Sequence, residues 1–112
     1  MSKTRQELIE RALLEVGVLA AGQTPSAEDS LVIDQAISPV MSDLATRDIY
    51  TWGDPDVFED DAFEHLGVIL ANSRAPTFGM PRDENTRFMC EARLKQLRLA
   101  ILSGSRQTAE YF

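Results

Sequence analysis

Apolar residues recur along this chain at the spacing of helical faces, and their pattern predicts four helices. The first helix is expected to begin after Thr4, because Glu7 stands at the capping-box position and can reach back to the Thr4 amide. It is expected to end at Gly17, since glycine suits the left-handed position that stops a helix. The predicted buried face of this helix consists of Leu8, Ala12, Leu13 and Val16.

The second helix is expected to begin at Ser26, with acidic residues in the first turn, where the helix dipole favours them. Pro39 lies inside this helix and removes the backbone hydrogen bond to Gln35. The sequence therefore predicts a helix that is kinked or split at Pro39 and that ends near Arg47. Its apolar seam consists of Ile33, Ile37, Val40 and Leu44.

The third helix is expected to begin near Pro55 or Asp56. It should end at Ala75, because the residue before a proline avoids the helical region. Its apolar face consists of Phe58, Ala62, Phe63, Leu66, Ile69 and Leu70.

The fourth helix is expected to begin near Arg82 or Asp83 and to end near Leu102. The tripeptide Ser103-Gly104-Ser105 is predicted to break it. Its apolar seam consists of Cys90, Leu94, Leu97 and Ile101.

No segment shows the sustained alternation or the hairpin dipeptides that indicate β-strands. The sequence therefore predicts an all-α fold, a small bundle of four main helices with a kinked second helix and an extended C-terminal arm. The 112 residues suffice for one domain. That domain is expected to span residues 1–103, and a flexible arm is expected at residues 104–112.

Charge is distributed unevenly along the chain, whose formal net charge is −7. Residues 20–73 contain eleven acids and a single basic residue, whereas residues 74–106 contain seven basic residues and three acids. The overall acidity argues against a general nucleic-acid binder. Six of the acids lie between Asp54 and Glu64, where they indicate either a solvated helix N-terminus or an acidic docking surface.

Residues that carry enzyme chemistry are scarce. His65 is the only histidine and Cys90 the only cysteine, so no tetrahedral metal site is complete and no intrachain disulfide can form. No phosphate loop or nucleophile motif is present. We therefore expect no metal, no cofactor and no enzymatic activity, and a buried thiol at Cys90. The sequence also lacks an apolar run of membrane-spanning length and a signal peptide, so no membrane partner is expected.

Two groups of aromatic residues lie outside the predicted seams. Tyr50 and Trp52 belong to an irregular stretch that either lies against the core or carries a contact. Tyr111 and Phe112 end the chain behind a polar segment. Such a tail either packs back on its own helices or forms an arm that becomes ordered in a partner's pocket.

Several features occur together over nearly the whole chain. The first helix, Thr4 to Val18, closes in Val-Gly-Val, and an acidic second helix and the aromatic loop Ile49-Tyr50-Thr51-Trp52-Gly53 follow it. The third helix ends in Ala71-Asn72-Ser73-Arg74-Ala75-Pro76-Thr77-Phe78-Gly79, and a last helix with basic residues leads into the C-terminal arm. This combination resembles the small helical adaptor proteins beneath the portal of tailed bacteriophages, namely head-completion connectors and tail accessory factors.

The resemblance implies a structural virion protein of the neck, between capsid and tail, that is made in the host cytoplasm. Its subunits would form a ring, usually of twelve copies, that binds the portal protein and the next tail or neck component. Double-stranded DNA would pass through the lumen without sequence recognition. The portal-binding arm would consist of Arg106, Gln107, Thr108, Ala109, Glu110, Tyr111 and Phe112.

The charge distribution suits a contact in which one subunit's acidic face meets its neighbour's basic face. The predicted acidic face consists of Asp56, Glu59, Asp60, Asp61 and Glu64, and the predicted basic face of Arg87, Arg93, Lys95 and Arg98. Tyr50 and Trp52 are predicted to form a loop contact. The alternative function is a small acidic regulator or inhibitor that binds a single host or phage protein through its acidic face.

Overall fold

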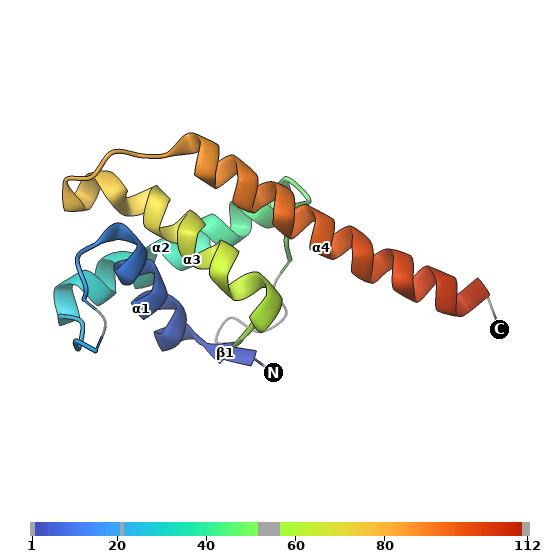
Figure 1. The fold of residues 1–112 in the computed structure, drawn as a ribbon, viewed down its shortest axis with the longest axis horizontal. Coiled ribbons are helices and arrows are strands. Elements are labelled where there is room, and N and C mark those ends of the chain that lie inside the picture. Colours follow the sequence, from blue (N-terminus) through green and yellow to red (C-terminus); the bar gives the residue numbers. More distant parts are fainter. Residues whose placement is uncertain (1, 21, 52–56, 111–112) are drawn as a thin grey trace.

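The structure is a computed structural model that describes residues 2–20, 22–51 and 57–110, with the side chains of these residues from Lys3 to Leu97. It confirms the all-α prediction, because four helices make up most of the described chain (Figure 1). The elements in order are β1 (Ser2–Thr4), α1 (Arg5–Val16), α2 (Ala27–Thr46), β2 (Val57–Glu59), α3 (Asp60–Arg74), the 3-10 helix η1 (Ala75–Phe78) and α4 (Glu84–Glu110).

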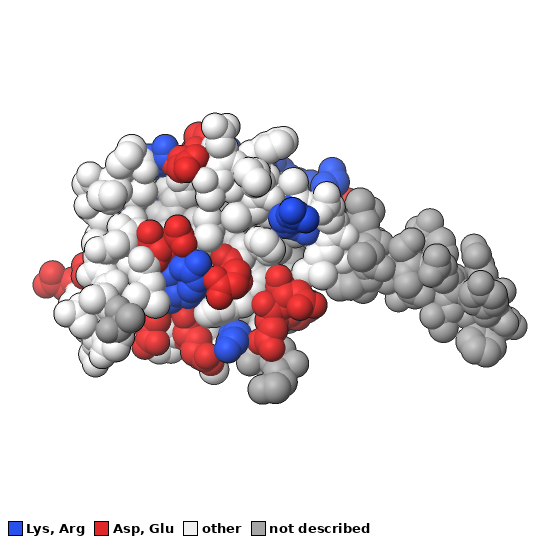
Figure 2. Space-filling model, in the orientation of Figure 1, with Lys and Arg blue, Asp and Glu red and all other residues white. Residues whose placement is uncertain are grey.

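The helix α3 lies at the centre of the fold and packs against α1, α2 and α4. The helix α4 covers one side of α3 and then continues away from the bundle, which makes the molecule elongated, at 52 × 27 × 22 Å (Figure 1). In the same view, charged side chains gather over α1 and the beginning of α3, and much of the rest of this face is uncharged (Figure 2). The body of the protein is therefore compact, and its last helix projects from one end.

The ends of α1 confirm the local sequence prediction. The Thr4 hydroxyl accepts from the Glu7 amide at 3.2 Å, and the Glu7 carboxylate accepts from the Thr4 amide at 3.1 Å. Gly17 has φ +86° and ends the helix, and the amide of Val18 donates to the Leu13 carbonyl at 3.2 Å. These contacts fix both ends of the helix within a few residues along the chain.

The helix α2 begins after its predicted cap, Ser26, and is continuous through Pro39. Pro39 and Gln35 are both exposed residues, so the hydrogen bond that the proline removes belongs to the solvent side of the helix. A bend at a proline on the solvent side also curves a helix around the core that it covers. Pro39 thus does not split the helix, and the predicted seam remains on one face.

The prediction that the chain has no strand is wrong for two short segments. β1 and β2 pair antiparallel, with Lys3 opposite Phe58. Each strand is only three residues long and leads directly into a helix, with Thr4 and Glu59 in extended conformation at the N-caps. Such strands are too short to show alternation in the sequence.

The same pairing shifts the beginning of α3. The helix starts at Asp60, and Val57–Glu59 form a strand where the sequence predicted a first helical turn. Pro55 and Asp56, the predicted starting points, lie outside the described residues. Phe58 is nevertheless buried as predicted, at 1% exposure, because one side chain of the short strand points into the core.

The end of α3 and the beginning of α4 follow the prediction closely. α3 ends at Arg74 and continues as η1 to Gly79, whose φ is +78°. The carboxylate of Asp83 then accepts from the Thr86 amide at 3.1 Å, which caps the first turn of α4. Pro76 at the start of η1 keeps the α-helix from continuing.

The predicted break at Ser103-Gly104-Ser105 is wrong, because the backbone of α4 is helical up to Glu110. A glycine inside a helix costs about 1 kcal/mol relative to alanine, which long helical segments on either side can offset. Residues 104–110 therefore continue the projecting helix and form no irregular segment, and no change in backbone structure marks residue 103.

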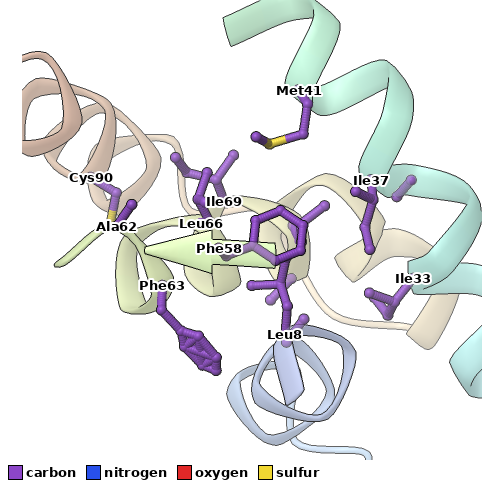
Figure 3. Close-up of a cluster of buried hydrophobic side chains, with 14 of the residues drawn as sticks. Leu8, Ile33, Ile37, Met41, Phe58, Ala62, Phe63, Leu66, Ile69 and Cys90 are labelled. Carbon is purple, nitrogen blue, oxygen red and sulfur yellow. The ribbon is translucent and has the colours of Figure 1, made fainter. Parts of the chain in front are cut away.

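Phe58 lies inside the core, among side chains of all three surrounding helices. Figure 3 shows it between Leu8 of α1, Ile37 of α2 and Leu66 of α3. The buried apolar residues are Leu8, Ile9, Ala12, Leu13, Val16, Ile33, Ala36, Ile37, Met41, Leu44, Ile49, Tyr50, Phe58, Ala62, Phe63, Leu66, Ile69, Leu70, Ala71, Ala75, Cys90 and Leu94. Most of the predicted seam residues are among them.

Gly67 allows α1 and α3 to approach closely. A Cβ atom placed on Gly67 would lie 2.8 Å from the Cγ atom of Arg11 and 3.9 Å from the backbone nitrogen of Ala12. The first distance is shorter than carbon atoms tolerate, so the glycine makes room for the stem of Arg11. The absence of a side chain at this position thus lets the stem of Arg11 lie against α3.

We predict that Gly67→Ala lowers the free energy of unfolding by about 1–3 kcal/mol in the wild-type background, because the new methyl group overlaps the Arg11 side chain. In an Arg11→Ala background the same change should be neutral or stabilising by up to about 1 kcal/mol, since the overlap is gone and alanine favours helix. Urea unfolding of the four chains measures both values. An equal loss of unfolding free energy in the two backgrounds would contradict the overlap with the Arg11 side chain.

Candidate functional site

The predicted acidic residues gather where α3 begins. Glu59 ends β2, Asp60 and Asp61 form the first turn of α3, and Glu64 lies one turn further on; all four are exposed. We call these four residues the α3 acidic start. The positive end of the α3 dipole stabilises carboxylates in the first turn. Asp56, the fifth predicted residue, lies outside the described residues.

Part of this acidity is neutralised within the chain. The Nε atom of Arg11 donates to Glu64 at 2.5 Å, and its Nη2 atom donates to Glu15 at 3.0 Å. Burial alone would lower the pKa of Arg11, but the two carboxylates outweigh it and raise the pKa. Glu64 therefore links α3 to α1. Glu59 and Asp61 are exposed carboxylates of the α3 acidic start that a partner can reach.

The predicted basic face is also partly used inside the fold, by a cluster around Glu91. The carboxylate of Glu91, with 8% of its side chain exposed, accepts from Arg47 at 3.0 and 2.7 Å and from Arg87 at 2.9 Å. Arg47 also bonds Asp43 at 2.6 Å, and Arg87 also bonds Glu84 at 2.7 Å. We call Asp43, Arg47, Glu84, Arg87 and Glu91 the Glu91 cluster.

The Glu91 cluster joins the end of α2 to α4 and compensates its own charges. The hydrogen bonds from Arg47 to Glu91 and Asp43 raise the pKa of Arg47, and the hydrogen bond to Glu84 raises the pKa of Arg87. A carboxylate as buried as Glu91 requires such partners, because an unpaired charge in the interior is costly. Arg87 thus has a structural role within its own chain, which its assignment to the inter-subunit basic face did not include.

The outer side of α4 carries exposed residues that the sequence analysis did not single out. Phe88 and Met89 are 70% and 63% exposed, the highest values among the large apolar side chains that the structure describes. Both lie off the seam of Cys90 and Leu94, so helical periodicity alone indicated that they face outward. Arg93 and Lys95 are exposed on the same helix as predicted, whereas the side chain of Arg98 is not described.

A groove runs beside these residues, between α4 and the end of α2. Its volume is about 430 Å³. It is lined by Arg47, Ile49, Arg87, Phe88, Glu91, Ala92 and Lys95. Phe88 and Ala92 of α4 thus share this concave surface with Arg47, Arg87 and Glu91 of the Glu91 cluster.

Tyr50 is 7% exposed and belongs to the core, so the prediction of a loop contact at Tyr50 is wrong. The two amides at Ile49 and Tyr50 both donate to the Leu44 carbonyl, and this turn folds the segment back on the end of α2. Burial and the nearby carboxylate of Glu59 raise the pKa of the Tyr50 hydroxyl to about 12. Trp52, the other predicted contact, lies outside the described residues.

This raised pKa predicts a loss of stability in alkali. Tyr50 should stabilise the fold fully below pH 10.0, and the contribution should be lost as the pH rises towards about 12, up to roughly 2 kcal/mol. The reason is that the unfolded chain loses the proton at lower pH than the folded one. Urea unfolding of the wild type and of Tyr50→Phe from pH 9 to pH 12 measures this loss. The free energy of unfolding of Tyr50→Phe should fall less steeply with pH than that of the wild type. Identical slopes would contradict the assignment.

The predicted portal-binding arm lies at the tip of α4. The backbone of residues 106–110 is helical and lies far from the bundle (Figure 1). The side chains of these residues, and Tyr111 and Phe112 altogether, are outside the described part of the chain. Up to Glu110 the helix thus leads away from the core and does not fold back on it.

Cys90 and His65 are the two residues whose side chains could take part in chemistry. Cys90 is buried, and burial followed by the carboxylates of Glu15 and Glu91 raises the pKa of its thiol. His65 is half-buried on α3. In the described part of the chain, no group of three or more His, Cys, Asp or Glu residues is placed to hold a metal ion. None of the described helices is long and apolar enough to span a membrane.

We predict that Arg47→Ala and Glu91→Ala each lower the free energy of unfolding by about 1–2 kcal/mol, because each change leaves a charged partner of the Glu91 cluster less well paired. The double variant should lose less than the sum, since the two residues stabilise one another. Thermal or urea unfolding measures this coupling. Arg93→Ala, on the exposed side of α4, is the control and should change stability by less than about 0.5 kcal/mol. If the losses of the two single variants simply added up in the double variant, Arg47 and Glu91 would not stabilise one another.

Comparison with known proteins gives no match to this chain among protein-family models, curated proteins or solved structures. The fold itself defines a small all-α bundle with a projecting last helix. Its candidate functional features are surfaces: the α3 acidic start, the outer side of α4 and the end of the projecting helix.

Proposed function

We propose that this chain is the subunit of a head-to-tail adaptor of a tailed bacteriophage, which forms a ring beneath the portal and links the capsid to the tail. The main observation in favour is the course of α4. It packs against α3 with Cys90 and Leu94 and then carries the C-terminal residues away from the bundle (Figure 1). A helix that leaves its own core presents its end to another molecule.

The C-terminal residues suit this role by their composition. The last two residues are aromatic, and the polar segment Gln107 to Glu110 precedes them. Aromatic side chains at the end of a chain supply a large contact area at low entropic cost when they enter a pocket. The proposed arm, residues 106–112, would therefore bind the portal through this terminus.

The arrangement of charge supports assembly from identical subunits. The α3 acidic start and the exposed basic residues Arg93 and Lys95 lie on different elements of the same chain. Two complementary patches at different places on one subunit form a heterologous contact, which closes into a ring when its rotation permits. A ring of about twelve copies in the neck of the virion is the form that the sequence resemblance favours.

The net charge suits a conduit for DNA. A chain of charge −7 repels the phosphate backbone, so a ring of such chains would bind passing DNA weakly. DNA would then move through the lumen without sequence recognition during packaging and ejection. The adaptor would receive the next tail or neck component at the end opposite the portal.

Deletion of residues 107–112 tests the portal-binding arm. The truncated chain should keep its helical circular dichroism and cooperative unfolding, because the described core ends well before these residues, but it should no longer bind the portal ring of the same phage. Binding is measured by sedimentation of the mixture or by electron microscopy. Leu31→Ser, at an exposed position of α2, is the control and should bind like the wild type. Unchanged portal binding by the truncated chain would refute the arm.

The mass of the complex separates this function from the alternative of a small acidic regulator. An adaptor should add many copies to one portal ring, whereas a regulator should remain a monomer or dimer and leave the portal unoccupied. The exposed acids of the α3 acidic start are the observation that keeps the regulator in consideration.

A further inference from the structure

The first three turns of α4 carry an exposed strip that differs from the rest of the surface. Its two large apolar side chains, Phe88 and Met89, are the most exposed of the large apolar side chains that the structure describes, and Arg93 and Lys95 flank them. The exposed residues from 85 to 96 are Asn85, Phe88, Met89, Ala92, Arg93, Lys95 and Gln96. None of these seven is acidic, although the chain as a whole has a charge of −7. We call them the outer strip.

The outer strip is not part of the chain's own packing. Cys90 and Leu94 turn towards α3, so the strip on the opposite side of the helix faces away from it. Glu91, the acid within this stretch of the helix, is held inward by Arg47 and Arg87, and the exposed Glu84 that precedes the strip is hydrogen-bonded by Arg87. The strip therefore presents apolar surface and two cations, and its own chain supplies no exposed acid between residues 85 and 96.

The chain itself contains a surface of matching chemistry. Beside the α3 acidic start lies Val57, an apolar residue of β2 that is 43% exposed. Val57 together with Glu59 and Asp61 thus combines apolar surface with negative charge, as the outer strip combines apolar surface with positive charge. Because the outer strip faces away from α3, the two surfaces of one chain cannot meet each other.

The geometry points to a head-to-tail contact in which the outer strip of one copy of this chain binds Val57 and the α3 acidic start of a second copy. Phe88 and Met89 pack against Val57, while Arg93 and Lys95 pair with Glu59 and Asp61. This inference rests on the proposed function, since it specifies the subunit contact of the ring. Phe88 and Met89 form the centre of this contact. Arg87 is not part of it, because Arg87 is paired within the Glu91 cluster.

The contact is small. The outer strip has seven exposed residues, whereas a stable interface uses roughly 20–30 residues on each side. A single pair of subunits in solution is accordingly held weakly, and closure of a ring adds the contacts together. Chemical cross-linking suits such a contact, because it captures short-lived pairs.

The experiment uses full-length chains in a Cys90→Ala background, so that the engineered cysteine is the only thiol. One chain carries Met89→Cys and the other, distinguished by a size tag, carries Val57→Cys. A short bis-maleimide should link the mixed pair several-fold more than either chain with itself, and the yield should fall as salt is raised. Leu31→Cys, which is 53% exposed on α2, replaces Val57→Cys as the matched control.

Charge reversal gives the second measurement. Glu59→Lys with Asp61→Lys on the Val57→Cys chain should abolish the mixed cross-link, and so should Arg93→Glu with Lys95→Glu on the Met89→Cys chain. Combining the two reversed chains should restore it, because the opposite charges again face each other. Circular dichroism of each chain checks that the substitutions preserve the helices.

Three results would overturn the inference: a mixed yield no higher than the Leu31→Cys control, a dominant link between two Met89→Cys chains, and failure of the combined reversal to restore the link. These results are obtained without the portal. They are therefore distinct from the portal-binding assay, which decides the proposed function by itself.

Discussion

The close approach of α1 to α3 is the contact on which the rest of the fold depends. Gly67 leaves room for the stem of Arg11, and at the entry to both helices the pairing of Lys3 with Phe58 holds the two chain segments together. The β-pair also places Phe58 in the centre of the core, where three helices meet around it. With α1 fixed on α3, α2 and α4 cover the remaining faces.

The charged residues divide into those that the fold uses and those that remain for other molecules. Glu91 is buried and therefore needs both Arg47 and Arg87, and Glu64 holds Arg11 across two helices. The sequence alone predicted that these charged residues lie at the surface, but they are paired within the chain. The exposed charges outside these pairs include Glu59 and Asp61 at the α3 acidic start, beside the exposed Val57, and Arg93 and Lys95 on the outer strip, beside Phe88 and Met89. Such combinations give both direction and binding energy to a contact.

The projecting helix makes the two ends of the molecule different from each other. Residues 84–97 belong to the body, and the backbone beyond them extends away from it as far as Glu110 (Figure 1). Contacts between neighbouring copies would use the body, and contact with the portal would use the tip of the helix. Under the proposed function, this separation would let one small chain bind two kinds of partner without competition between them.

The sequence by itself determined the features that depend on residues within one or two helical turns. The Thr4 capping box, the cap at Ser26 and the stop at Gly17 follow from local spacing, and the structure shows each of them. Most of the predicted seam residues are buried too, while Val40 and Leu97 are partly buried and the side chain of Ile101 is not described. Only the tertiary structure decided the pairing of β1 with β2, the burial of Tyr50 and the Arg47–Glu91 pair, whose partners are 44 residues apart. Three-residue strands and single ion pairs carry no periodicity, so packing of distant segments alone brings them together. The predicted break at Ser103-Gly104-Ser105 was wrong for a related reason, because the cost of one glycine is small beside the continuity of a long helix.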